Sequence, residues 1–239
     1  MRGWWCAGAA AVALAWLLGV LVQVVAGDAL PPDISVSQYG VGPHGWLFSM
    51  WMLATAAGPC LLYQYRPVRG LGAGWWLAIG LLGTAVMAAV RTDPGGLQES
   101  VNAKIHMVGA VLALGGLPIG ILCTLLAATR PWRWCGVALV IASAISLELL
   151  LISAAGVDTT GAGAVTSWSL WQSVALAADL LLLVAMVFGS RTIPPVAGDP
   201  EPWWTGRVAG GQGVGRVRAA GPVRMPAGGG AARDVTAGG

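Results

Sequence analysis

The sequence predicts an all-α polytopic membrane protein, in which six transmembrane helices form one bundle. Two observations support this fold class. Hydrophobic residues make up 56% of the 239-residue chain and charged residues only 10%, whereas soluble domains carry about 25% charged residues. Six segments are also apolar over roughly the 20 helical residues that cross a bilayer core of about 30 Å. We therefore expect lipid to surround most of the chain, because apolar side chains need no cover there.

The six predicted helices share an apolar run that contains at most one acidic residue and no lysine or arginine. They span residues 4–26, 44–63, 72–90, 105–128, 134–155 and 168–189. The fifth contains Glu148 and the sixth contains Asp179. An alternative interpretation takes the first segment as a cleaved signal peptide. Its apolar run exceeds the usual length of about 7–15 residues and is preceded by a single arginine, so we interpret it as a transmembrane helix.

The positions of the basic residues predict the orientation. If the N-terminus is inside, the inner ends of the helices hold six arginines and no acidic residue, and the outer loops hold five acidic and two basic residues. The inner arginines are Arg2, Arg66, Arg69, Arg130, Arg133 and Arg191. The positive-inside rule then places both termini in the cytoplasm. Alanine and glycine are abundant and almost all of the basic residues are arginine, which is typical of proteins from GC-rich genomes. We therefore expect the plasma membrane of a bacterium, with membrane lipids as partners.

The composition changes after Arg191, where the transmembrane domain (1–191) ends. Residues 192–239 hold twelve glycines, six prolines and scattered arginines. Such a segment cannot bury a core, so we expect a disordered cytoplasmic tail. The chain has no basic cluster interleaved with aromatic residues, which argues against nucleic acid as a partner.

Ionisable residues gather at the outer ends of the predicted helices and near the middle of the last one. We expect six of them to form an outward-facing polar pocket: His44, Arg91, Asp93, His106, Glu148 and Asp179. A charge in hydrocarbon costs at least about 2.5–3.5 kcal/mol, so Glu148 and Asp179 should face the bundle interior. Gln172 lies two turns before Asp179 and indicates a polar seam on that helix.

Several interpretations of these polar residues stay open. They form a network that fixes helix register, a binding site for a lipid headgroup or small polar ligand, or a set of acid–base groups. The chain contains no HExxH or GxSxG motif, and its four cysteines form no CxxC pair, so we predict no catalytic residue, metal or cofactor. Two histidines at similar depth are weak evidence for haem.

Three stretches carry a family resemblance. They read DISVSQYGVGPHGWLF at 33–48, RTDPGG at 91–96 and NAKIHMVGA at 102–110. In this order they resemble the bacterial membrane family called domain of unknown function 998, over about residues 4–190. The resemblance gives weight to Ser35, Gly40, Asp93 and His106. The layout is more remotely similar to the DRAM, Frag and Sfk group of six-span proteins, which implies lipid handling.

The leading hypothesis is therefore a non-enzymatic membrane protein that binds a lipid headgroup or small polar ligand. One alternative is a membrane enzyme acting on lipid or envelope precursors at the outer leaflet. For an enzyme we expect Asp93, His106 and Glu148 to converge around a cavity. A second alternative is a structural accessory subunit, whose protein partners the sequence does not specify.

Overall fold

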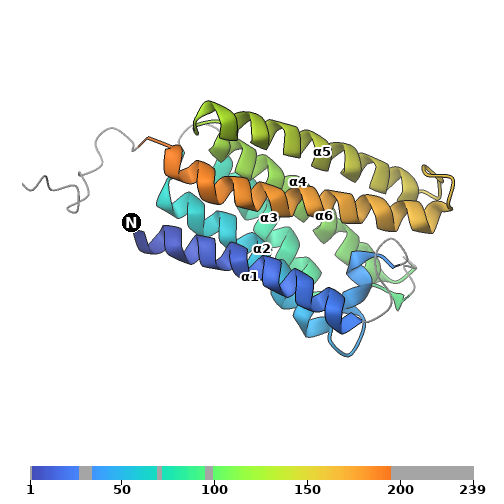
Figure 1. Ribbon diagram of the computed structural model, residues 1–239. Helices are drawn as coiled ribbons and strands as arrows, with labels where there is room; N and C mark the ends of the chain where they lie inside the picture. The colour runs from blue at the N-terminus through green and yellow to red at the C-terminus, as the bar shows by residue number, and fades with distance from the viewer. Residues whose placement is uncertain (1, 27–33, 69–71, 95–98, 195–239) are drawn as a thin grey trace, which may run out of the picture. The chain divides into compact units, whose positions relative to one another are not determined.

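A computed structural model describes residues 2–26, 34–68, 72–94 and 99–194. These residues form six α-helices and two short 3₁₀ helices, η1 and η3 (Figure 1). In chain order the elements are α1 (Arg2–Ala26), η1 (Val36–Gly40), α2 (Gly45–Tyr65), α3 (Ala73–Ala89), α4 (Val101–Leu125), α5 (Arg130–Ala154), α6 (Ala164–Gly189) and η3 (Ser190–Thr192). Residues 195–239 of the predicted tail lie outside the described residues, as do Asp28, Asp33 and Arg69.

Each predicted helix is present, with bounds within four residues of the prediction. α4, α5 and α6 begin one turn earlier than expected because their first turns contain polar residues, which interrupt the apolar run. Ser100 caps α4 by accepting the Ala103 N–H at 3.0 Å, and Pro131 lies at the start of α5, where a missing N–H is tolerated. Five helices are long and apolar enough to cross a membrane, and α3 is shorter at 17 residues. The chain is a multi-span membrane protein.

The helices lie side by side as three consecutive pairs, α1–α2, α3–α4 and α5–α6. The start of α1 and the end of α6 meet at one end of the bundle (Figure 1). There the Trp5 indole N–H donates to the Val187 carbonyl at 3.1 Å, and the Arg191 guanidinium lies 3.7 Å from the centre of the Trp5 ring. Both helix ends therefore share a side, as the predicted orientation requires. Which side is cytoplasmic stays a prediction.

Glycines bring α3 and α4 into backbone contact. A Cβ atom at Gly116 would lie 2.6 Å from the backbone nitrogen of Gly80, and one at Gly120 would lie 2.8 Å from that of Leu77. These two glycines form the GxxxG step of α4, and small residues at this spacing let membrane helices approach closely. The α3–α4 pair is consequently a rigid unit in which no side chain larger than hydrogen fits at these positions.

The segment that precedes α2 packs into the bundle. Val36 and Tyr39 of η1 are buried. The Val36 N–H donates to Gln172 Oε1 at 2.9 Å, which joins η1 to α6, and the Gln38 amide donates to the Asp93 carbonyl at 2.9 Å. The loop therefore forms part of the wall of the cavities at this end of the molecule.

Candidate functional site: a groove between α1 and α6

The largest cavity described is a groove of about 670 Å³ between α1 and α6. It exists because α1 packs along α2 and makes only sparse contact with α6. Its walls come mainly from the second half of α1 and the middle of α6. The lining residues are Trp16, Gly19, Val20, Gln23, Val24, Val36, Trp51, Ser173, Leu176, Ala177 and Leu180. Ligand sites commonly have volumes of about 300–1,000 Å³, so the groove is large enough to hold a ligand.

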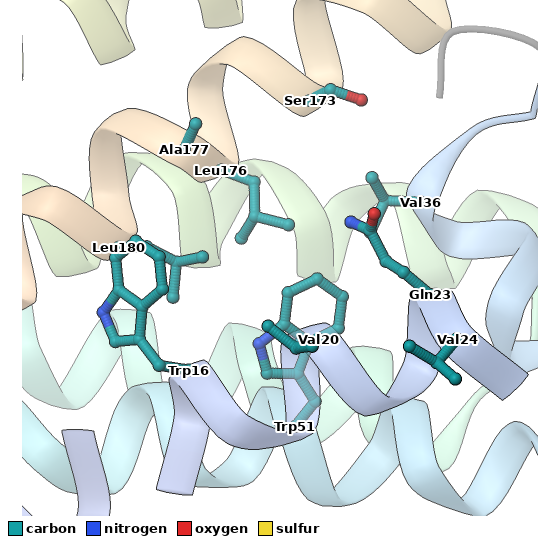
Figure 2. Close-up of a pocket in the computed structure, with 11 residues that line it drawn as sticks. Trp16, Val20, Gln23, Val24, Val36, Trp51, Ser173, Leu176, Ala177 and Leu180 are labelled. Atoms are coloured by element: carbon teal, nitrogen blue, oxygen red, sulfur yellow. The ribbon is translucent and has the colours of Figure 1, made fainter. Parts of the chain in front are cut away.

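The groove has an apolar end and a more polar end. Figure 2 shows Trp16 and Leu180 at one end, with Gln23 and Ser173 toward the other, beside Val36. The Ser173 hydroxyl donates to the Ser169 carbonyl at 2.8 Å, so its oxygen remains an acceptor. Gln23 is exposed and makes no hydrogen bond to any other described residue. An amide in that state offers both a donor and an acceptor to a ligand.

Trp51 forms part of the groove floor and explains one glycine of α1. Its side chain is 1% exposed. A Cβ atom at Gly19 would lie 3.0 Å from the indole ring, so only glycine leaves room for this tryptophan at its present distance from α1. The indole N–H is buried and has no partner within the described part of the chain. Trp51 therefore packs between α1 and the bundle core and forms the inner surface of the groove.

Asp179 faces the bundle interior, as predicted. It is 6% exposed, and Oδ1 accepts a hydrogen bond from the Ser143 hydroxyl of α5 at 2.7 Å. Gln172 is buried on the same face of α6, which confirms the predicted polar seam. Asp179 also lines a cavity of about 30 Å³ with Thr55 and Thr84, about the volume of one water molecule. The carboxyl thus joins α5 to α6 and lies apart from the outer rim.

His106 is also buried, but another contact fixes it. It is 4% exposed, and its Nδ1 lies 2.6 Å from the Val90 carbonyl oxygen at the end of α3. A carbonyl only accepts, so Nδ1 carries the proton in this contact. The ring stacks on Phe48 at 6.3 Å between centroids. Nε2 is buried and has no partner among the residues described. His106 therefore fastens α4 to the end of α3.

The rim residues Asp93, Arg91 and His44 have separate positions. Asp93 accepts the hydroxyl and backbone N–H of Ser100 and the backbone N–H of Glu99, so it organises the start of α4. These hydrogen bonds, led by the Ser100 hydroxyl, hold the pKa of Asp93 below its ordinary value. Arg91 and His44 are exposed. His44 lines a second cavity, of about 440 Å³, with Tyr39.

The expectation that Glu148 faces the interior is wrong. Its side chain is exposed. α5 packs through buried Ser143, Ser146, Leu150 and Ser153, which follow one another at helical spacing. Glu148 lies two residues from Ser146 and from Leu150, and two residues turn a helix about 200° away from its buried stripe. The carboxylate therefore points to the outside of α5, about 9 Å from the end of the helix.

The six predicted residues consequently do not form one hydrogen-bonded cluster. Within the described residues, no hydrogen bond or ion pair joins any two of them, and Asp93 and Glu148 line none of the cavities described. No group of three or more His, Cys, Asp or Glu side chains suited to a metal occurs in this part of the chain. Instead, Asp179 is hydrogen-bonded between α6 and α5, His106 between α4 and the end of α3, and Asp93 to the residues that precede α4.

The sequence interpretation missed the groove residues. Trp16, Val20 and Leu180 resemble any lipid-facing residues in a transmembrane segment, and a gap between two helices leaves no mark in either one. Gln23 was the available signal, because it is the lone amide in the first helix and lies in the apolar run that follows Arg2.

Comparison with known proteins returned one family. Residues 9–189 match the model of the family described as protein of unknown function DUF998. No curated protein and no solved structure matches the chain. The remoter likeness to the DRAM, Frag and Sfk group is not shown by these comparisons. With the matched region covering α2 to α6 and most of α1, this multi-span membrane protein belongs to the DUF998 family.

Proposed function

We propose that the chain is a non-enzymatic protein of the bacterial plasma membrane that binds a membrane lipid in the α1–α6 groove. The observation that carries this proposal is the groove itself, which has a volume of about 670 Å³ and is lined mainly by apolar side chains of two transmembrane helices. With both termini in the cytoplasm, the groove extends from the middle of the bilayer toward its outer boundary, because it uses the second half of α1 and the middle of α6.

The chemistry of the walls favours an acyl chain as the occupant. Valine, leucine, alanine and tryptophan side chains offer dispersion contacts to hydrocarbon along most of the groove. Water is a poor occupant, since the described lining has few polar side-chain atoms, those of Gln23 and Ser173 and the indole N–H groups of Trp16 and Trp51. The groove opens sideways between two helices, so a lipid can enter from the bilayer without crossing the outer surface.

Lipid binding is supported better than the enzyme hypothesis. An enzyme acting at the outer leaflet requires acid–base groups close to one another. Asp93 accepts hydrogen bonds from Ser100, His106 is bonded to the end of α3, and Glu148 points away from the interior. A small polar ligand is supported less than a lipid, because none of the described residues that line the groove is charged.

Native mass spectrometry of the purified protein tests the proposal. The double variant Val20→Trp with Ala177→Trp narrows the groove from both walls. The matched control is Leu17→Trp with Val174→Trp, which places the same side chains at exposed positions on the same two helices that do not line the groove. We expect wild type and control to retain a lipid and the groove variant to lose most of it. Equal retention in both variants, or no retained lipid in wild type, would refute the proposal.

A further inference from the structure

The polar end of the groove lies at a defined depth in the membrane. Gln23 follows the start of α1 by 21 residues, which is about 32 Å along a helix axis. The hydrocarbon core of a bilayer is about 30 Å thick. Gln23 is therefore at the outer boundary of the core, if α1 starts at the inner boundary. In a glycerolipid, the first polar groups met at that boundary are the ester carbonyls that join the chains to glycerol.

Gln23 requires a hydrogen-bond partner at this depth. An amide without a partner in an apolar environment costs roughly 2 kcal/mol or more, and Gln23 has no partner among the described residues. Figure 2 shows its side chain reaching toward Val36, at the same end of the groove as Ser173 on the opposite wall. The Ser173 hydroxyl has its proton on the Ser169 carbonyl and so accepts only. A ligand carbonyl, which also only accepts, can therefore pair with Gln23 and not with Ser173.

The described lining of the groove offers no charged side chain that could bind a charged lipid headgroup. Among the residues that the structure describes, its lining has no Lys, Arg, His, Asp or Glu side chain. Selection in this site must then come from the chain and from the group that joins the chain to the rest of the lipid.

On the basis of the proposed function, we propose that the groove selects ester-linked acyl lipids through a hydrogen bond from the Gln23 amide N–H to the ester carbonyl, whatever the headgroup. Ether-linked lipids have the same chains and no carbonyl, so they lose this hydrogen bond. One net hydrogen bond corresponds to about threefold to tenfold in affinity.

Competition between matched lipids tests this inference. The protein in nanodiscs is offered an ester-linked phosphatidylcholine and the ether-linked lipid of identical chains and headgroup, and bound lipid is counted by native mass spectrometry. We expect wild type to prefer the ester lipid by about threefold to tenfold. Ser173→Ala should keep the preference and Gln23→Leu should abolish it while still binding lipid. Replacing phosphatidylcholine with phosphatidylglycerol in both lipids should leave the preference unchanged.

The possible failures are distinguishable. Equal binding of ester and ether lipids by wild type overturns the Gln23 inference, and so does a preference that survives in Gln23→Leu. If lipid binding in those measurements is still lost in the Val20→Trp, Ala177→Trp variant, the groove remains the lipid site and only the carbonyl selection fails. If that variant binds as wild type does, the proposed function fails too.

Discussion

The α3–α4 pair and the α1–α6 pair represent opposite ways of placing two transmembrane helices side by side. In α3–α4, glycines bring the backbones into contact, and no space remains between the helices at those points. In α1–α6, Trp16, Val20 and Leu176 project between helices that touch only sparsely, and a groove remains. The first pair provides a fixed frame, and the second provides space for a ligand. The α5–α6 pair is fixed by the buried bond from Ser143 to Asp179.

The largest loss of stability is expected from a substitution that separates α3 from α4. Gly116→Leu inserts a side chain where even a Cβ atom would meet the backbone of α3. We expect it to destabilise the protein by about 3 kcal/mol, the upper end of the usual cost of overpacking, because backbone contacts relax poorly around it. Thermal unfolding in detergent measures the effect. The control is Gly115→Leu, one residue away, where a Cβ atom would meet nothing within 4 Å. Equal losses in both variants would contradict the backbone-contact explanation.

A smaller effect is expected where polar bonds join α5 to α6. Ser143→Ala leaves the buried Asp179 carboxyl without its donor. Leaving such a group unsatisfied costs about 1–3 kcal/mol. Unfolding by denaturing detergent measures the loss. Ser146→Ala is the matched control on the same helix, because its hydroxyl bonds only the Ala142 carbonyl of its own helix. We expect Ser143→Ala to be clearly less stable than Ser146→Ala. Equal stability of the two variants would show that the Asp179 hydrogen bond does not stabilise the α5–α6 pair.

The loop between α5 and α6 should make a pH-dependent contribution to the stability of the folded protein. Asp158 accepts the backbone N–H groups of Thr160, Gly161 and Gly163 and the Ser167 hydroxyl. These hydrogen bonds, led by that of Thr160, hold the pKa of Asp158 well below its usual range. A depressed folded-state pKa adds stability that is present above the unfolded pKa and lost as the pH falls through the folded pKa.

Asp158→Asn should therefore lower the melting temperature slightly at neutral pH. The gap between wild type and variant should narrow as the pH falls from about 5 to below 3. Melting curves across that range give the comparison, and a gap that is constant or widens toward low pH would show that the carboxylate is not the stabilising form.

The smallest change in stability is expected from a larger side chain in the groove between α1 and α6. Ala177→Leu adds side-chain volume to the groove wall, where space exists. We expect a change in stability within about 0.5 kcal/mol, as for substitutions away from packed features. The same leucine is severe at Gly116, so thermal unfolding of the two variants side by side measures the contrast directly. A loss at Ala177 as large as that at Gly116 would mean that α1 and α6 are in fact closely packed.

The sequence was sufficient for the helices and only partly sufficient for the site. Hydropathy located all six helices, since the length of an apolar run is a local property. Asp179 was placed inside correctly because a carboxyl near the bilayer centre has few other options. The same reasoning failed for Glu148, which lies closer to a helix end and off the buried stripe of α5. Nothing local to α1 or α6 reveals that the two helices stand apart, because that gap follows from the packing of α1 on α2.

An experimental structure of the protein in lipid nanodiscs would show whether a lipid occupies the groove. We expect a continuous chain of density in the groove, running past Val20 and Leu176 and ending in a polar group beside Gln23. A groove that is closed by direct packing of α1 on α6, or open and without an ordered chain, would contradict it.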